Sequence, residues 1–337
     1  MVSIAVGDSI STSGANGFSR ILCWQSMWGL RRTNLDISVI IVNWNTKELL
    51  LNCLESVFET VRGIDFEVWL VDNASNDGSV KAAKEKYSSI NVIQNQENLG
   101  FAAANNLAFK RMNGRYALLL NTDAILTHGA AKELYDFMEV NSEAGIACGQ
   151  LLNQDGSKQN SIANFPSLLS LLSNETLLRV LFPKKFPSKR KEYSSPLEID
   201  SCIGACMIVR KKAIDEAGFF DESYFFFFEE TDLAYRMSRS GWKVYFVPKA
   251  RIFHIQGKSI GGGAKGRVLY YRSRYIFLKK WLRRSYNLIC VVVFMRLLVN
   301  TFLTLLGFLF TLGYYAPIRS RLIVYFQLIL WHLRGCP

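Results

Sequence analysis

Short apolar runs alternate with segments of helical periodicity from Ile37 onward, and this alternation constrains the fold more than any other feature. The run Ile37–Val42 is rich in β-branched residues, as expected for a strand that is buried on both faces. The next segment, Thr46–Thr60, places apolar residues at helical spacing. Further strand-like runs follow at Glu67–Val71, Asn91–Asn95 and Tyr116–Leu120. This order predicts an α/β fold with a Rossmann-like, doubly wound, mostly parallel sheet and helices on both faces.

Two acidic residues, Asp72 and Asp123, each come directly after a predicted strand. In sheets of this kind ligands bind beyond the carboxyl ends of the strands, so both side chains are expected at one crevice. Asp123 lies in the apolar stretch LLLNTDAIL, where an ionised carboxylate is costly without a positive or hydrogen-bonding partner. Each aspartate could instead cap the helix that follows it. Two of them on the same edge favour a ligand or metal site.

The second half of the chain is expected to begin with a loop-rich region, Leu151–Leu197, and then carries a denser group of acidic residues in FFFFEETDLAYR. Apolar surroundings raise the pKa of a carboxyl group and make it a competent base, which makes Glu229 and Glu230 candidates. The alternative is a helix N-terminus enriched in acids that match its dipole. A helix is predicted over Asp232–Gly241, and the RIFHI stretch after it contains His254, a core histidine or a cation ligand.

The formal net charge of +12 is concentrated in clusters such as Arg267–Arg284. The apolar segment Asn287–Gly313 follows at once and is long enough to cross a bilayer, and a shorter apolar run occupies Leu322–Leu333. Basic residues before, between and after these runs favour monotopic or re-entrant attachment at the cytoplasmic face of the membrane over a crossing. Two buried helices of a soluble domain are the alternative. Nucleic acid is not expected as a partner, because the chain shows no recognisable binding module.

Three domains are therefore predicted: a disordered extension over residues 1–35, a catalytic domain over 36–265 and membrane-associated helices over 266–337. The seven cysteines form no CxxC pair, which favours a reducing compartment over a disulfide scaffold.

Taken together and in order, several motifs resemble those of the family 2 glycosyltransferases with the GT-A fold, particularly the bacterial rhamnosyltransferase-like branch. The resemblance runs from Ile37 to about Gln256. The matching stretches are ISVIIVNWN, VDNASNDGS, NLGFAAANN, LLLNTDAIL, DGSKQNSIANFPSL, IGACMIVRK, GFFDESYFFFFEETDLAYR and VPKARIFHI.

The resemblance implies a role for each matched position. The residues around the nucleotide-sugar donor would be Asn45, Asp72, Asn98, Gly100, Asn105, Asn121 and Thr122, with Asp72 on the base. Gly204 and Ala205 would line the floor where donor sugar and acceptor meet. Asp123 and His254 would bind Mg²⁺ or Mn²⁺. The general base would be Glu230, with Glu229 as its rival.

Two positions depart from the family pattern. The metal motif reads Asn121-Thr122-Asp123, so its first carboxylate is missing and a lower metal affinity is expected. Glu230 stands where Asp is more usual, which lengthens the side chain by one methylene. Asp232 is expected to be structural.

The activity implied is metal-dependent, inverting transfer of a sugar from a dTDP-, UDP- or GDP-linked donor, with dTDP-rhamnose as leading donor. The acceptor would be a saccharide or a polyprenyl-diphosphate-linked saccharide used in cell-surface polysaccharide synthesis. The rival hypothesis is a catalytically inactive, nucleotide-sugar-binding membrane protein. A dinucleotide oxidoreductase is disfavoured, because the sequence after the first strand, NWNTKELL, lacks the G-x-G-x-x-G motif.

Overall fold

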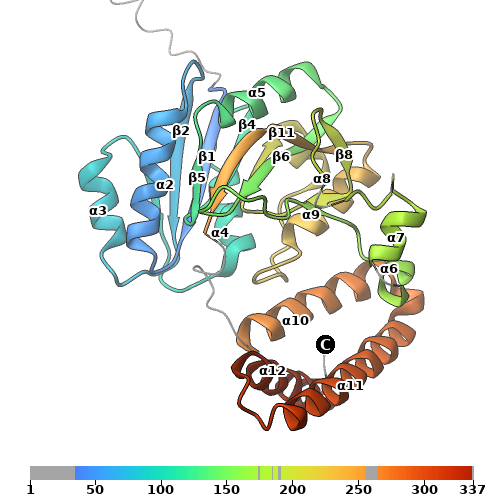
Figure 1. The fold of residues 1–337 in the computed structure, drawn as a ribbon. Helices are drawn as coiled ribbons and strands as arrows, with labels where there is room; N and C mark the ends of the chain where they lie inside the picture. The colour runs from blue at the N-terminus through green and yellow to red at the C-terminus, as the bar shows by residue number, and fades with distance from the viewer. Residues whose placement is uncertain (1–34, 174, 184, 189–190, 256–263, 336–337) are drawn as a thin grey trace, which may run out of the picture. The chain divides into compact units, whose positions relative to one another are not determined.

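The computed structural model describes residues 35–173, 175–183, 185–188, 191–255 and 264–335 (Figure 1). The predicted N-terminal extension lies outside the described residues, apart from Leu35. Five cysteines fall within the described ranges and all five are free thiols, four of them buried.

One mixed sheet forms the centre of the fold. Its strands are β1 (Ile37–Asn43), β2 (Phe66–Asp72), β3 (Asn91–Gln94), β4 (Tyr116–Asn121), β5 (Ala124–Leu126), β6 (Ala144–Leu152), β8 (Leu197–Ile199), β10 (Cys206–Arg210) and β11 (Lys243–His254). They follow the order β3-β2-β1-β4-β10-β6-β11-β5, with β8 paired to β11. Six strands run in one direction, whereas β5, β8 and β10 run against it. The mostly parallel sheet is thus confirmed, with β10 inserted antiparallel between β4 and β6.

Helices cover both faces of this sheet, as the sequence predicted. The helices up to Arg239 are α2 (Lys47–Thr60), α3 (Ser79–Lys86), α4 (Gly100–Phe109), α5 (Ala130–Val140), α6 (Leu168–Leu172), α7 (Glu175–Leu181), α8 (Lys211–Ala217) and α9 (Glu229–Arg239), of which α6 and α7 lie outside the two core clusters. One core cluster joins α2, α3 and α5 to one side of β1, β2 and β4. A second cluster joins α4, α8 and α9 to the opposite side. β1 and β4 are therefore buried on both faces, which explains their nearly continuous apolar sequences.

The structure differs from the sequence analysis in three local features. The region from Leu151 to Leu197, expected to be rich in loops, also contains the short helices α6 and α7 and the strand β7 (Ile162–Ala163), which pairs with β9 (Ser201–Cys202). Helix α9 begins at Glu229 instead of Asp232 and ends at Arg239, two residues before Gly241. The RIFHI stretch extends β11. The register of β11 against β6 shifts between Val247 and Arg251, and Pro248 lies within this irregular stretch. Such an irregularity tolerates a proline that cannot donate to the ladder.

Three long helices form the C-terminal part: α10 (Ala264–Trp281), α11 (Tyr286–Phe310) and α12 (Ala316–Leu333), with a 3₁₀ turn at Arg283–Ser285. Helix α12 packs on α10, where the Tyr275 hydroxyl lies 2.9 Å from His332 Nε2. Among the described residues, only the segment Arg283–Phe310 is long and apolar enough to cross a membrane, and an 18-residue stretch of it has a mean hydropathy of 2.3.

Helix α11 turns a narrow stripe toward the protein and a broad apolar face away from it. The buried stripe consists of Ile289, Val293, Leu297 and Thr301. The exposed large residues include Leu288, Val291, Met295, Phe302, Leu303, Leu306 and Leu309. This is the reverse of a soluble helix, whose outer face is polar.

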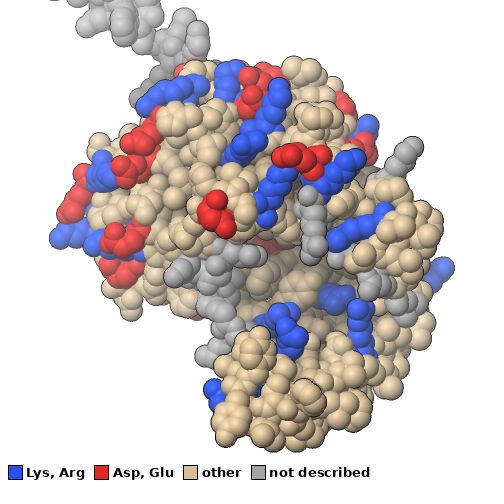
Figure 2. All heavy atoms as spheres, viewed as in Figure 1, with Lys and Arg blue, Asp and Glu red and all other residues tan. Residues whose placement is uncertain are grey.

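Charge divides the chain as sharply as hydropathy does. All 28 acidic residues lie at or before Asp232, so residues 233–337 carry only positive charge. Figure 2 shows acidic and basic side chains interspersed over the sheet-bearing part and only basic ones among the uncharged residues of the C-terminal helices.

Candidate active site

The carboxyl ends of β1 and β2 are joined by a buried hydrogen-bond cluster centred on Asn43. Its side-chain amide donates to the Asp72 carboxylate at 2.8 Å and to the Ser75 and Ser79 hydroxyls at 3.0 and 2.8 Å. The other Asp72 oxygen accepts the backbone N–H of Ser75 at 2.9 Å. Asp72 is 1% exposed, and all of these contacts order the loop that it begins. The expected position of Asp72 at the sheet edge is confirmed, and its contact with a nucleotide base stays a prediction.

A second cluster orders the NLGF turn beside this loop. Asn73 donates to Asn98 Oδ1 and to the Gly100 carbonyl, both at 3.2 Å, and Asn98 Oδ1 also accepts the Gly100 N–H at 2.9 Å. Gly100 has φ +82°, and a Cβ there would lie 2.5 Å from the Phe225 carbonyl oxygen. Only glycine meets both conditions without strain.

The two remaining predicted donor residues of this region differ in exposure. Asn45 is exposed, has φ +52°, and holds the loop opposite by accepting the Asn76 N–H at 2.8 Å. Asn105 is fully buried within α4, where its amide donates to the Phe101 carbonyl at 2.9 Å. The structure therefore brings Asn45 to the sheet edge and keeps Asn105 in the interior.

Asp123 and His254 come together at the end of β4, as predicted from sequence. Asp123 Oδ1 lies 3.4 Å from His254 Nε2, and the two side chains are 1% and 8% exposed. His254 Nδ1 lies 2.9 Å from Gln159 Oε1, while the Gln159 amide donates to the His254 carbonyl at 2.6 Å. Gln159 thus fixes the imidazole with Nδ1–H donated to it and Nε2 directed at the carboxylate, the tautomer that a metal-binding histidine requires.

Asp123 and His254 fit a divalent cation as an oxygen and an imidazole ligand. In the described ranges no group of three or more His, Cys, Asp or Glu residues could hold a metal. Two protein ligands leave coordination positions that a bound substrate or water can fill, which suits a site completed by a donor diphosphate.

The residues beside Asp123 connect β4 to the rest of the edge. Thr122 Oγ1 lies 3.0 Å from the hydroxyl of Thr46, which also donates to Asn43 Oδ1 at 2.8 Å. The Asn121 N–H donates to the Ala205 carbonyl at 2.9 Å. The predicted donor and floor positions are therefore linked by a direct hydrogen bond.

Gly204 then connects this edge to the predicted base. A Cβ on Gly204 would lie 3.7 Å from both Cβ and Cγ of Glu230, so the glutamate side chain passes over the glycine. Ala205 is 1% exposed and supports the turn from below. The structure thus brings Gly204 and Glu230 together, as expected of a floor and a base.

Glu229 and Glu230 differ in access although they are adjacent. Burial raises the pKa of Glu230 to about 7. Burial and the charge of Glu230 raise the pKa of Glu229 well above its usual value. Glu229 is 4% exposed and its Oε2 has no hydrogen-bond partner among the described residues, whereas Glu230 is partly exposed. Glu230 is therefore the better placed of the two to exchange a proton with a substrate.

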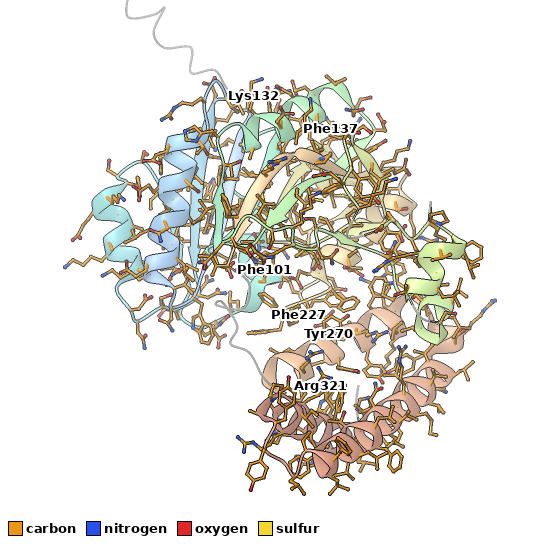
Figure 3. All side chains as sticks on the ribbon, in the orientation of Figure 1. Phe101, Lys132, Phe137, Phe227, Tyr270 and Arg321 are labelled. Carbon is orange, nitrogen blue, oxygen red and sulfur yellow. The ribbon has the colours of Figure 1, made fainter. Side chains whose placement is uncertain are left out.

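The segment before these glutamates has an unusual backbone. Phe227 and Phe228 have φ values of +68° and +70°, a conformation that is rare for aromatic residues and costs on the order of 1–3 kcal/mol each. The ring of Phe227 lies 5.7 Å from that of Tyr270 on α10, and Figure 3 shows the two side by side. Asp232 is fully buried in ion pairs with Arg236 and Lys280, so its expected structural role is confirmed.

Three amides are among the site residues that were given no role from sequence: Asn43, Asn73 and Gln159. Each lies inside a stretch that the family resemblance had matched, but none is charged, and amides carry no signal in composition or periodicity. Their hydrogen bonds to Asp72, Asn95 and His254 join residues that are 22 to 95 positions apart in the sequence, so local patterns do not reveal them.

Comparison with known proteins agrees with this geometry. Residues 38–218 match the family described as Glycosyl transferase family 2. An N-acetylglucosaminyl-diphospho-decaprenol L-rhamnosyltransferase of Mycobacterium tuberculosis is 28% identical over 227 residues, 63% of this chain and 74% of that protein. The rhamnosyltransferase WbbL of Escherichia coli K12 is 24% identical over 228 residues, 65% of this chain and 83% of that protein.

A solved structure shares the fold. GalNAc-T7 with UDP, GalNAc and Mn²⁺ matches with a TM-score of 0.53 at 18% identity, and the match covers 71% of this chain and 47% of that one. This likeness confirms the expected GT-A-like arrangement. Since the family match spans more than half of the sequence and contains β1, β2 and β4 with the site residues at their ends, this chain belongs to glycosyl transferase family 2.

Proposed function

We propose that this glycosyltransferase inverts the anomeric centre of a nucleotide sugar, with dTDP-rhamnose as leading donor, and acts on a polyprenyl-diphosphate-linked saccharide. One observation carries the proposal: the turn that is bonded to Asn121 also contacts Glu230, so a carboxyl group of raised pKa lies beside the donor edge. The mycobacterial relative, named for L-rhamnosyl transfer to a decaprenol-diphosphate-linked sugar, supports these donor and acceptor classes.

The chemistry assigned to Glu230 is general-base catalysis. Its carboxylate takes the proton of an acceptor hydroxyl, the hydroxyl oxygen bonds to the anomeric carbon, and the bond from that carbon to the nucleotide diphosphate breaks. A single displacement inverts the anomeric configuration and needs no covalent enzyme nucleophile. A pKa near 7 leaves about half of the Glu230 carboxyls ionised at neutral pH, which suits a base that must accept a proton there.

Asp123 and His254 are the residues that would hold Mg²⁺ or Mn²⁺. Such a cation, when bound, supplies positive charge to the diphosphate leaving group. Gln159 orients His254. The buried Asn43 cluster holds the Ser75 loop at the sheet edge where the nucleotide is proposed to bind.

Attachment to the cytoplasmic face of the membrane through α11 and α12 completes the proposal. The exposed apolar face of α11 suits contact with acyl chains. The absence of acidic residues after Asp232 suits an anionic lipid surface. A polyprenyl acceptor would meet the enzyme at that surface.

The test is transfer by the purified full-length protein in detergent, with dTDP-rhamnose and a panel of UDP- and GDP-sugars, with and without Mn²⁺. The acceptor is polyprenyl-diphospho-N-acetylglucosamine. Turnover of dTDP-rhamnose that requires Mn²⁺ and is lost in Glu230→Gln, but not in the exposed-site control Glu97→Gln, is the expected result. Turnover of another donor would show that dTDP-rhamnose is the wrong donor. Donor binding without turnover would favour the rival hypothesis of an inactive binding protein.

Membrane attachment is tested separately with vesicles. Full-length protein should co-sediment with vesicles that contain anionic phosphatidylglycerol, and less with purely zwitterionic ones at low salt. Protein that stays in the supernatant with both kinds of vesicle would contradict the attachment.

A further inference from the structure

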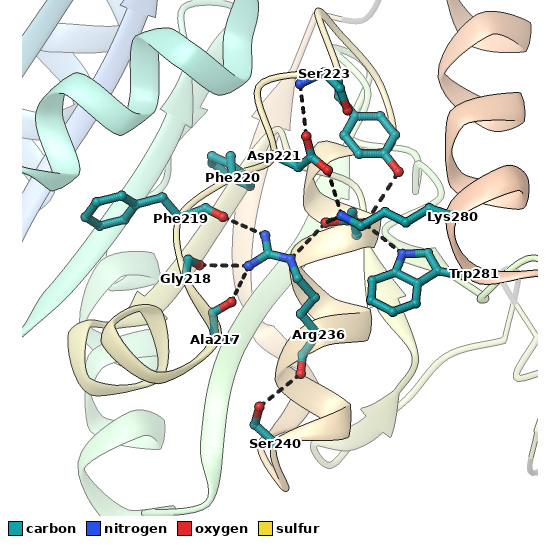
Figure 4. Close-up of polar contacts among 12 residues, drawn as sticks. Ala217, Gly218, Phe219, Phe220, Asp221, Ser223, Arg236, Ser240, Lys280 and Trp281 are labelled. Atoms are coloured by element: carbon teal, nitrogen blue, oxygen red, sulfur yellow. Dashed lines mark hydrogen bonds and ion pairs between the residues drawn. The ribbon is translucent and has the colours of Figure 1, made fainter. Parts of the chain in front are cut away.

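The first turns of α9 hold a buried carboxylate on which three nitrogen donors converge, together with the Tyr224 hydroxyl at 3.4 Å (Figure 4). Asp232 lies two residues after Glu230 and is 0% exposed. It accepts from Arg236 Nε at 2.8 Å and from Trp281 Nε1 at 2.7 Å, and Lys280 Nζ lies 2.9 and 3.0 Å from its two oxygens. Two of the three donors come from the last residues of α10, about fifty positions downstream.

The cations that surround Asp232 are themselves fixed at their other ends. Lys280 Nζ also donates to Asp221 at 2.6 Å. The Arg236 guanidinium donates to the backbone carbonyls of Ala217, Gly218 and Phe219. Helix α10 contains no acidic residue, and its Lys280 binds two of the last acidic residues of the chain, Asp221 and Asp232.

Helix α10 also contacts the segment on the other side of Glu230. The Ser273 hydroxyl donates to the Phe226 carbonyl at 2.7 Å. The ring of Phe228 lies 5.8 Å from that of Phe277, and both are buried. The two residues with left-handed backbone therefore lie under α10, which holds them in a conformation that they would not keep alone.

From these contacts we infer that Lys280 and Trp281 are positioning residues for the reaction, acting on Glu230 through Asp232. This inference rests on the proposed role of Glu230 as base. Helix α10 clamps α9 at Asp232 and the preceding loop at Phe226 and Phe228, so the base has one position only while α10 is docked. Attachment of the C-terminal helices and activity of the site are thereby coupled.

Trp281→Phe is the sharpest variant, because it removes the N–H donor and keeps an aromatic ring against Tyr235, whose centroid is 4.7 Å away. Trp242→Phe is its matched control, since Trp242 Nε1 donates to the Glu216 carboxylate at 2.8 Å, away from α10. Lys280→Met, with Lys280→Arg as the conservative rescue, removes the second donor. All variants are made in the full-length protein in detergent.

The steady-state experiment measures kcat and KM separately, with the donor that the wild type turns over. Trp281→Phe and Lys280→Met should lower kcat by about tenfold to a hundredfold, in line with a small displacement of a catalytic group, and leave donor KM unchanged. Trp242→Phe should keep the wild-type kcat, and Lys280→Arg should recover part of the loss. Wild-type kcat in a folded Trp281→Phe protein, or an equal loss in both tryptophan variants, would overturn the inference.

A second readout needs no substrate. Amide hydrogen exchange over residues 226–232 should be faster in Trp281→Phe than in Trp242→Phe, and equal exchange would contradict the clamp. Glu230→Gln separates the two hypotheses. If it retains transfer, the proposed base is wrong; if it is inactive while Trp281→Phe is normal, only the positioning role is wrong.

Discussion

The two sides of the site are built in different ways. The donor side is a network of amides and hydroxyls, including Asn43, Asn73 and Thr46, around the Asp72 carboxylate, and the ends of adjacent parallel strands place it. The base side is built at the start of α9, and it depends on buried charges and on a helix from the end of the chain. Sheet topology therefore places the proposed donor residues, whereas the proposed base, Glu230, also depends on the C-terminal part.

The largest effect should come from the base side. Glu230→Gln keeps the shape of the side chain but cannot take a proton, so transfer should fall by on the order of 10²–10⁴-fold with donor affinity unchanged. Steady-state kinetics and calorimetric titration of the donor measure the two quantities. If Glu230→Gln weakened donor binding as much as it lowered transfer, Glu230 would belong to the donor side, and the two sides would not differ in function.

On the donor side, the sharpest change is to Gln159. Gln159→Ala removes the partner of His254 Nδ1 and should raise the Mn²⁺ concentration needed for half-maximal donor binding by about 10–100-fold. Asp123→Ala should have at least as large an effect. Titration of Mn²⁺ against donor binding checks both, and an effect on kcat at saturating Mn²⁺ without one on binding would contradict the assignment.

The pH dependence of the rate should belong to the base side. Because the pKa of Glu230 is raised to about 7 and the base acts when ionised, kcat/KM should fall about tenfold per pH unit below 7. Donor binding should change little over pH 6 to 8. A rate that is flat through this range would place the proton acceptor elsewhere.

The smallest effect tests the contact between the two sides. Gly100→Ala forces a Cβ against the Phe225 carbonyl and places alanine at φ +82°, which should lower the free energy of unfolding by about 1–3 kcal/mol. Gly78→Ala, with φ +76° and nothing near its added Cβ, is the matched control for the backbone term alone. Equal losses by denaturant titration would show that the Phe225 contact is unimportant.

The donor side was predictable from sequence because its geometry is local to each strand. β1 begins at the predicted Ile37, and its register pairs Asn43 with Asp72 and Val42 with Asn121. The shared edge of Asp72 and Asp123 follows from parallel strands of similar length. The pairing of Asp123 with His254 came only from the family resemblance, since 131 residues separate them.

The base side could not be derived in the same way. No propensity predicts that Phe228, in left-handed conformation, precedes the first residue of α9. Nor does any pattern pair Asp232 with Lys280 and Trp281, because a single carboxylate can be matched with any of 40 basic residues. The antiparallel insertion of β10, which places Gly204 next to β4, also depends on long-range pairing.

The left-handed phenylalanines have a consequence for the adaptability of this enzyme. Glycine at 227 or 228 would relieve the backbone strain but would lose the packing of the aromatic ring. Selection for heat tolerance alone would favour glycine wherever the relief of strain exceeds the lost packing. The same change would make the start of α9 more mobile, so the proposed base, Glu230, would no longer be held in one position. Heat tolerance and turnover therefore compete at these two positions, and a thermostable descendant of this chain that keeps both aromatic rings must gain its stability elsewhere.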